Sequence, residues 1–381
     1  MDFHWTDGQL AFRRRVRNFI DEHLPADWER LTEGLDVGSD NTVAFSRTFC
    51  PALAKEGLLV PHWPKEFGGC DADAWHHWIL NEEMIRSGEP RSYQYMSVNW
   101  VGPALIRFGT QSQKAEFLPR IAAGSMVFCQ GFSEPNAGSD LVSLKTSARQ
   151  DGEGWVVSGQ KIWTSAASFA DVCILLARTG GPGRKGVTMF MAPMDTPGIE
   201  VRVIPSKMGA RALHEVFFKD ARLGPETVLG AVNAGWEVVT HILHHERIGI
   251  PRYIISLHAL DRAVNLLKKA GDLGEVARAQ AARARAMCEA ARLQCYKVVD
   301  ARVKGRPPSA DTNLARIGLV MADRLVAEFL GDHVMDRLAG GEDPVIAGAY
   351  RRTSATGIAS GAAEIQLDLI ARNHLQLPRA A

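Results

Sequence analysis

The chain of 381 residues lacks the features that several classes of protein need. Its six cysteines include no C-x-x-C pair, so we expect reduced thiols in a cytoplasmic protein rather than a disulfide framework. The formal charge of +1 gives no field to attract nucleic acid or an anionic membrane, so neither is an expected partner. No apolar run is long enough to span a bilayer, and residues 1–10 lack the apolar core of a signal peptide.

Three catalytic motifs are also missing or out of context. No G-x-G-x-x-G opens a helix, which argues against a Rossmann nucleotide site. His241, His244 and His245 precede Glu246 without forming H-E-x-x-H, so no metal site is expected. The S-x-x-K match that begins at Ser158 lies at a hairpin edge, without the helix that a nucleophilic serine needs.

What is present is an ordinary globular composition, 46% apolar and 23% charged, in a chain long enough for two or three structural units. Helical patterns fill the first third, beginning with a capping box at Thr6 and Gln9. Short runs rich in β-branched and aromatic residues follow between 155 and 219, and helical patterns return from Trp236. This order predicts an α+β protein with an N-terminal helical domain (1–122), a middle β domain (123–230) and a C-terminal helical bundle (231–381).

Two loop-like motifs stand out in the middle region. FCQGFSEPNAGSD begins at Phe128, and SGQKIWTS ends at Ser165. Gly, Ser, Pro and Asn are the residues of ordered loops, and Trp163 offers a wide aromatic face beside clustered hydroxyl groups. Such a surface suits a flat ring with polar edges, such as a flavin. Composition alone would favour a simpler alternative, two hairpin loops of a β domain with a buried tryptophan.

The identity and spacing of the residues in these motifs point to one protein family. E-P-x-A-G-S-D followed by G-x-K-x-W-x-[ST] resembles the flavin loops of the acyl-CoA dehydrogenase family. The resemblance covers essentially the whole chain, because five further motifs occur in the family's order and spacing: WPKEFGG (63–69), LNEEMIRSG (80–88), KMG (207–209), HERIGI (245–250) and EIQ (364–366). It implies the same three-part fold, an FAD cofactor and dehydrogenation of an acyl-CoA thioester.

The resemblance also assigns cofactor-binding residues. It implies that Gln130, Phe132 and Ser133 line the flavin ring, and that Trp163 covers one face while Ser165 approaches the hydride-accepting nitrogen. Two loop residues would lie near the pyrophosphate, Gly138 and Ser139, the second of which would also touch the CoA arm.

The family's usual catalytic base is missing. Many members carry a glutamate just before a glycine and a few residues ahead of the I-Q pair, but this chain has Ser360 before Gly361. In a second family solution the base is the Glu of an E-R pair on a neighbouring helix, which is Glu246–Arg247 here. We expect Pro251 to bend that helix beside Glu246. Glu246 is therefore the candidate base, and Arg247, Ser360 and Gly361 are candidate substrate contacts. The alternative that we favour less is a surface ion pair between Glu246 and Arg247.

The segments with which a symmetric partner grips the adenine half of FAD are absent too. Residues 265–280 contain no R-x-x-F-G, and residues 333–348 contain no Q-x-x-G-G-x-G. Either a homo-oligomer binds FAD weakly or differently, or a second acyl-CoA dehydrogenase-like subunit completes the site in an α2β2 heterotetramer. We favour the second, because the chain resembles the heteromeric branch that oxidises steroid or cholesterol side-chain CoA thioesters.

That branch implies a bulky acyl group. The candidate acyl pocket is the segment 91–103, with Tyr95, Met96, Asn99 and Trp100 as its liners, although such side chains also form ordinary cores. The sequence thus predicts an FAD-dependent acyl-CoA dehydrogenase subunit whose flavin is reoxidised by an electron-transfer flavoprotein. Two rival functions stay open: a non-catalytic structural subunit of such a complex, and a flavin oxidase on the same fold.

Overall fold

The computed structural model describes residues 4–246, 248, 250–307, 309–359 and 361–378. The chain forms two compact units, each built from separated stretches of sequence. The helical unit contains residues 1–36, 72–90 and 247–381, and the sheet unit contains residues 37–71 and 91–246. None of the helices in the described ranges combines the length and the apolar character that a bilayer crossing requires.

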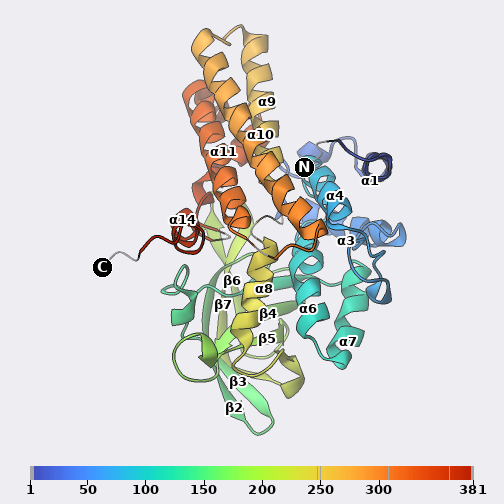
Figure 1. Ribbon diagram of the computed structural model, residues 1–381, viewed down its shortest axis with the longest axis vertical. Coiled ribbons are helices and arrows are strands. Elements are labelled where there is room, and N and C mark those ends of the chain that lie inside the picture. Colours follow the sequence, from blue (N-terminus) through green and yellow to red (C-terminus); the bar gives the residue numbers. More distant parts are fainter. Residues whose placement is uncertain (1–3, 247, 249, 308, 360, 379–381) are drawn as a thin grey trace. The chain divides into compact units, whose positions relative to one another are not determined.

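The helical unit is built around three long helices that lie side by side (Figure 1). They are α9 (Arg252–Ala270), α10 (Glu275–Val303) and α11 (Asp311–His333). Gly271 ends α9 in a left-handed conformation with φ of 78°, which glycine adopts without steric cost. The remaining elements are α1 (Asp7–His23), α2 (Trp28–Leu31), α4 (Ala74–Arg86), α12 (Met335–Ala339), α13 (Pro344–Arg352), η6 (Thr353–Ala355) and α14 (Ala363–Asn373).

One buried carboxylate connects four helices of this unit. Glu82 on α4 is 2% exposed and accepts hydrogen bonds from Tyr253 on α9 and from Tyr296 on α10, the latter at 2.8 Å. Arg13 on α1 approaches it to 2.6 Å. A carboxylate so far from water is stable only with such partners, so Glu82 fixes the packing of helices that are distant in the sequence.

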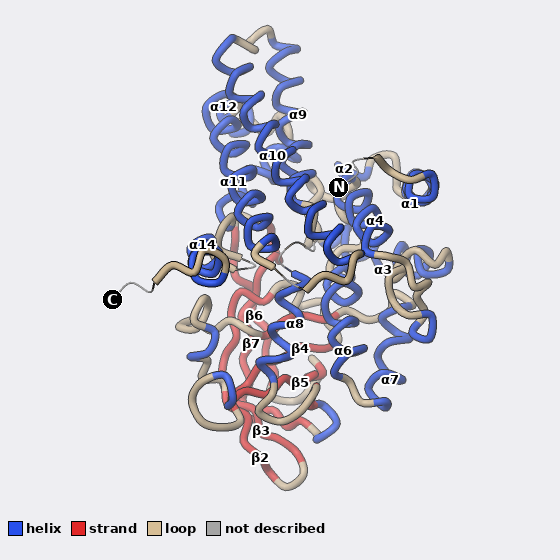
Figure 2. Tube along the Cα trace, viewed as in Figure 1, coloured by secondary structure: helices blue, strands red, loops and turns tan. Residues whose placement is uncertain are grey.

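The sheet unit contains an eight-stranded sheet, drawn in red in Figure 2. The strand order is β6-β7-β3-β2-β4-β5-β8, and β1 pairs in parallel with β4. The strands are β1 (Phe128–Gly131), β2 (Ser147–Asp151), β3 (Gly154–Thr164), β4 (Val172–Arg178), β5 (Val187–Pro193), β6 (Ile199–Ser206), β7 (Gly209–Leu223) and β8 (Val228–Leu229). Every residue of β4 from Val172 to Ala177 is buried, as expected of a strand covered on both faces.

Helices cover this sheet. The last helix of the unit, α8 (Gly235–Glu246), packs against β5, against α6 (Gly102–Phe108) and against the π-helix η2 (Ser97–Val101). The unit also contains α3 (Asp40–Lys55), η1 (Lys65–Phe67), α5 (Gln94–Met96), α7 (Gln111–Ala122), η3 (Leu141–Ser143), η4 (Arg184–Gly186) and η5 (Pro225–Thr227).

The predicted fold class is confirmed, with helical N-terminal and C-terminal parts and a sheet-rich middle. The capping box at Thr6 and Gln9 is formed. The prediction about Pro251 was wrong in one respect: α8 ends at Glu246 and α9 begins at Arg252, so the proline separates two helices instead of bending one. Proline has no N–H to donate to the helical hydrogen-bond ladder, and this property can end a helix as well as bend it.

Candidate flavin and acyl-CoA site

The two flavin motifs meet in the sheet unit through a backbone hydrogen bond. The amide of Ile162 near the end of β3 donates to the carbonyl of Ser133, just beyond β1, at 2.9 Å. This bond brings Phe132 and Ser133 next to Trp163. Phe132 is 7% exposed and Ser133 is half-buried. The sheet therefore joins the two motifs, which lie about thirty residues apart, into one local surface.

A buried ion pair fixes the first flavin loop. The ammonium group of Lys161 is fully buried and donates to the Phe132 carbonyl at 3.0 Å and to the Glu134 carboxylate at 2.8 Å. Glu134 also accepts from the backbone amides of Lys145 at 2.6 Å and Thr146 at 2.9 Å. Both ends of the loop are thereby held against β3.

The surroundings shift the pKa values of both partners. Burial lowers the pKa of Lys161 to about 8, although the negative charge of Glu134 opposes this shift. Burial tends to raise the pKa of Glu134, but Lys161 and the loop amides outweigh it and lower this pKa below its usual value. Near neutral pH both groups are charged, and each stabilises the other.

Trp163 is presented outward by an irregularity of β3. Its backbone has φ of 61°, a left-handed conformation that is strained for a bulky residue. It lies where the β3–β7 register shifts between Lys161 and Thr164. The side chain is 56% exposed, so its aromatic face is accessible to a ligand. The alternative of a buried tryptophan between two hairpins is therefore wrong.

A buried histidine holds the turn that follows Trp163. His214 on β7 is fully buried and hydrogen-bonds through Nδ1 to the Thr164 carbonyl at 3.0 Å. Its Nε2 is 2.9 Å from the hydroxyl of Ser168. Burial lowers the pKa of His214, so the ring is neutral at neutral pH. It thereby fixes the backbone from which the half-buried Ser165 projects.

The described residues fit a ring with hydrogen-bonding edges. Gln130 lies on β1, and its buried side-chain nitrogen has no hydrogen-bond partner in the part of the chain that the structure describes. The same is true of the buried Thr164 hydroxyl. Gly138 and Ser139 lie on an exposed loop, and no atom within 4 Å would meet a Cβ added to Gly138. A buried polar atom without a partner is costly, so a ligand that bonds to it is stabilising.

The candidate acyl pocket residues lie beside this surface. Met96, Asn99 and Trp100 are buried at 3–4% exposure, and the half-buried Tyr95 ring meets Trp100 edge-on with centroids 5.3 Å apart. Asn99 and Trp100 lie on η2, and single-turn π-helices occur frequently at functional sites. The hydroxyl of Ser97 on η2 accepts a hydrogen bond from the Phe128 amide of β1 at 2.9 Å, which connects this segment to the strand that carries Gln130.

Glu246 is the last residue of α8 and is half-buried. Its helix packs against η2, so the candidate base belongs to an element that touches the candidate acyl segment. Arg247 and Ser360 lie outside the described residues. Gly361 belongs to the helical unit and has φ of 91°. This left-handed backbone conformation favours glycine, because a residue with a Cβ would be strained there.

Sequence reasoning missed the residues that support the site. Glu134, Lys161 and His214 hold the backbone of residues that were predicted to contact the flavin. Lys161 belongs to the SGQKIWTS motif, so the sequence contained a signal that could have identified it. No pattern in the sequence marked His214 or Ser97, because their partners lie at least 30 residues away.

The fold, helical at both ends with a sheet-rich middle, is that of a class of dehydrogenases, and the comparisons with known proteins identify the family. Family models for the N-terminal, middle and C-terminal domains of acyl-CoA dehydrogenases match residues 6–125, 129–221 and 233–375. The chain belongs to the acyl-CoA dehydrogenase family and is an oxidoreductase of that family. Its members generally bind FAD.

The individual relatives confirm the resemblance to the steroid branch. The chain is 33% identical to acyl-CoA dehydrogenase IpdE1 of Mycobacterium tuberculosis, over 97% of this chain and 98% of the relative. A solved structure described as the Tcur3481-Tcur3483 steroid ACAD superimposes with a TM-score of 0.87 at 29% identity, covering both chains fully. The ChsE4-ChsE5 complex from Mycobacterium tuberculosis gives a TM-score of 0.86 at 29% identity, again over the full length of both chains.

Proposed function

We propose that this chain catalyses the FAD-dependent α,β-dehydrogenation of an acyl-CoA thioester with a bulky, steroid side-chain-like acyl group. It acts as the base-carrying subunit of a heteromer, and an electron-transfer flavoprotein accepts the electrons. The domain boundaries that go with this proposal are 1–122, 123–230 and 231–381.

One observation carries the flavin part of the proposal. Trp163 is held in a left-handed bulge with more than half of its surface exposed, beside a loop fixed by the buried Lys161–Glu134 pair. A purely structural chain has no use for a strained, exposed tryptophan, because exposure forfeits the free energy of burying its ring. The surface is therefore best explained by a planar ligand that covers the tryptophan.

Each proposed residue has a defined task in this reaction. FAD, when bound, supplies the hydride acceptor. Gln130, Ser133 and Ser165 hydrogen-bond the edge of the ring, Phe132 and Trp163 pack against it, and the exposed loop with Gly138 and Ser139 meets its pyrophosphate. Donors fixed before reaction stabilise charge without reorganising.

Glu246 accepts the proton from the carbon next to the thioester. Ser360 cannot do this, because a serine hydroxyl is far too weak a base near neutral pH. A carboxylate enclosed with an acyl-CoA away from water has a raised pKa, which makes it a stronger base. Arg247 and the Ser360–Gly361 backbone contact the substrate, and Tyr95, Met96, Asn99 and Trp100 form the acyl side of the pocket.

The assembly follows from what the sequence lacks. Without R-x-x-F-G and Q-x-x-G-G-x-G, a second copy of this chain lacks the residues that would bind the adenine half of FAD. A different acyl-CoA dehydrogenase-like subunit that carries both motifs completes the site in an α2β2 heterotetramer. The description of one solved relative as a complex of ChsE4 and ChsE5 supports this arrangement.

The test is to co-express the chain with a relative that carries both missing motifs. Glu246→Gln removes the base while keeping the size of the side chain, so we expect unchanged FAD content and a loss of turnover of at least about a hundredfold. Glu237→Gln is the matched control, because Glu237 is an exposed residue in the first turn of the same helix. Undiminished turnover in Glu246→Gln refutes the base assignment.

The rival functions give different results in this experiment. A structural subunit yields a complex in which Trp163→Ala changes neither flavin content nor activity. An oxidase reoxidises its reduced flavin rapidly with oxygen and needs no electron-transfer protein. A yellow, active preparation of this chain alone refutes the heteromer.

A further inference from the structure

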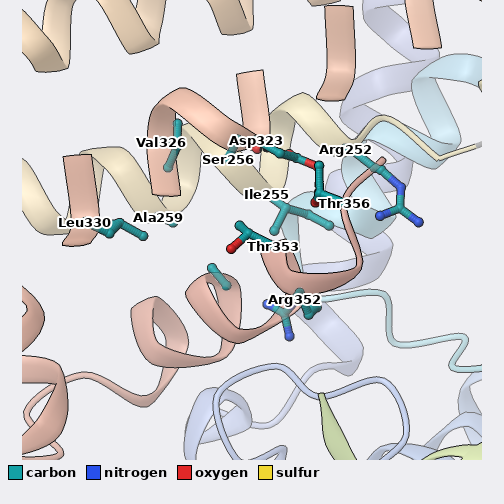
Figure 3. Close-up of a pocket in the computed structure, with 11 residues that line it drawn as sticks. Arg252, Ile255, Ser256, Ala259, Asp323, Val326, Leu330, Arg352, Thr353 and Thr356 are labelled. Atoms are coloured by element: carbon teal, nitrogen blue, oxygen red, sulfur yellow. Dashed lines mark hydrogen bonds between the residues drawn. The ribbon is translucent and has the colours of Figure 1, made fainter. Parts of the chain in front are cut away.

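A cavity lies inside the helical unit, among residues that play no part in the proposed flavin and acyl-CoA site. It lies between α9, α11 and α13, has an internal volume of about 40 Å³ and is partly open to solvent (Figure 3). Its walls come from helices that pack directly against one another, α9 against both α11 and α13. The pocket therefore lies between helices that pack together, with one side open to solvent.

One end of the cavity is apolar. Ala259, Val326 and Leu330 line it, and each is at most 2% exposed. Figure 3 shows Ala259 and Leu330 together at this end, with Arg252 at the opposite end. Such a surface binds hydrocarbon and offers nothing to a bare ion.

The other end carries charge. Asp323 is 8% exposed, and its two oxygens accept hydrogen bonds from the hydroxyls of Ser256 and Thr356, the latter at 3.1 Å. Because hydroxyl groups satisfy this carboxylate, it forms no ion pair with an arginine among the residues that the structure describes.

Two arginines remain without a bonded anion. Arg252 and Arg352 both line the cavity and are only partly exposed. Neither guanidinium group forms a hydrogen bond or an ion pair within the described ranges of the chain. Burial lowers the pKa of Arg352, the positive charges of Arg351 and Arg252 lower it further, and the attraction of Asp36 and of Asp323 offsets this only in part. A poorly solvated guanidinium strongly favours a carboxylate that it can hydrogen-bond.

We propose that this cavity binds a small monocarboxylate with an aliphatic body, its carboxylate between Arg252 and Arg352 and its hydrocarbon against Val326 and Leu330. The charged end alone would accept any small anion. The apolar end adds the requirement for a hydrocarbon portion, which inorganic anions lack. This site is independent of the proposed reaction, because its lining contains none of the residues assigned to flavin, base or acyl group.

The test measures binding without turnover, by titration calorimetry on the purified full-length protein in its native assembly. Three probes separate the requirements: pentanoate carries charge and hydrocarbon, inorganic phosphate carries charge alone, and 1-pentanol carries hydrocarbon alone. We expect saturable binding of pentanoate at one site per chain, at least about tenfold tighter than either of the others. Phosphate binding as tight as pentanoate, or no saturable binding of pentanoate, overturns the proposal.

Variants locate the site. Arg352→Gln removes a charge-assisted hydrogen bond and should weaken pentanoate binding about tenfold or more. Val326→Phe fills the apolar end and should abolish binding. The matched control is Arg351→Gln, because Arg351 is the exposed neighbour of Arg352 on the same helix and does not line the cavity.

Folding is checked by the thermal unfolding midpoint of each variant. Arg352→Lys keeps the charge and serves as the conservative replacement if Arg352→Gln does not fold. Equal weakening by Arg351→Gln and Arg352→Gln shows general electrostatic attraction and overturns the site. Unchanged binding in Val326→Phe does the same.

Discussion

Each unit of this protein buries a glutamate, and the two carboxylates serve different ends. In the helical unit Glu82 accepts from tyrosines on α9 and α10 and pairs with Arg13 on α1, so it joins helices. In the sheet unit Glu134 pairs with Lys161 and accepts two loop amides, so it shapes a loop. A buried carboxylate therefore stabilises the part of the structure that supplies its partners. In the helical unit this is the packing of the helices, and in the sheet unit it is the loop that carries the predicted flavin residues.

The largest effect is expected when the Lys161–Glu134 ion pair of the sheet unit is broken. Lys161→Met leaves Glu134 buried without its counter-charge, which costs about 3–5 kcal/mol and frees the Phe132 carbonyl. We expect a lower free energy of unfolding, measured by denaturant titration, together with loss of FAD from the co-purified complex. Lys219→Met is the control, because the Lys219–Glu200 pair is exposed. Normal flavin content in Lys161→Met would separate this pair from the ligand surface.

The corresponding change in the helical unit should affect stability without affecting the flavin. Glu82→Gln weakens the hydrogen bonds from Tyr253 and Tyr296 and removes one ion pair, while Arg13 keeps its contact with Glu83. We expect a loss of about 2 kcal/mol in the free energy of unfolding. FAD content per folded complex should stay near the wild-type value. Loss of flavin as large as in Lys161→Met would erase the contrast between the two units.

A pH titration sharpens the comparison through His214. Because burial lowers the pKa of this histidine in the folded state, the unfolded chain takes up its proton first as pH falls. Its contribution to stability is complete above the ordinary histidine pKa of about 6.5 and is lost progressively below it. Unfolding free energies measured at about pH 7.5 and about pH 5 should therefore differ more in the wild type than in His214→Asn. Equal pH dependence in both proteins would contradict the buried neutral ring.

The smallest expected change in stability comes from Trp163→Ala. The side chain is mostly exposed, so its removal should alter the free energy of unfolding by no more than about 0.5 kcal/mol. FAD affinity should nevertheless fall, because the face that covers the ring is gone. Unchanged FAD affinity, measured by equilibrium titration of the apoprotein, would contradict the role assigned to this tryptophan.

The sequence predicted more of the fold than of the site. The helix–sheet–helix order was legible from periodicity, and the strands from 155 onward were found approximately where they lie. The short strand β1 was not expected, because glycine and polar residues mask its β pattern. Within the helical first third, Gly109 and Thr110 separate α6 from α7, a break that periodicity alone does not mark.

The motifs by themselves determined the family, the flavin loops and the absence of the usual base and of both partner motifs, because each depends on residue identity at fixed spacing. Tertiary structure alone decided that Trp163 is exposed in a strained bulge, that Lys161 is buried against Glu134, and that η2 adjoins β1 through Ser97. It also decided that two arginines share a cavity with Val326 and Leu330. These features depend on contacts between residues far apart in the chain, and local sequence does not encode which distant partner a side chain will meet.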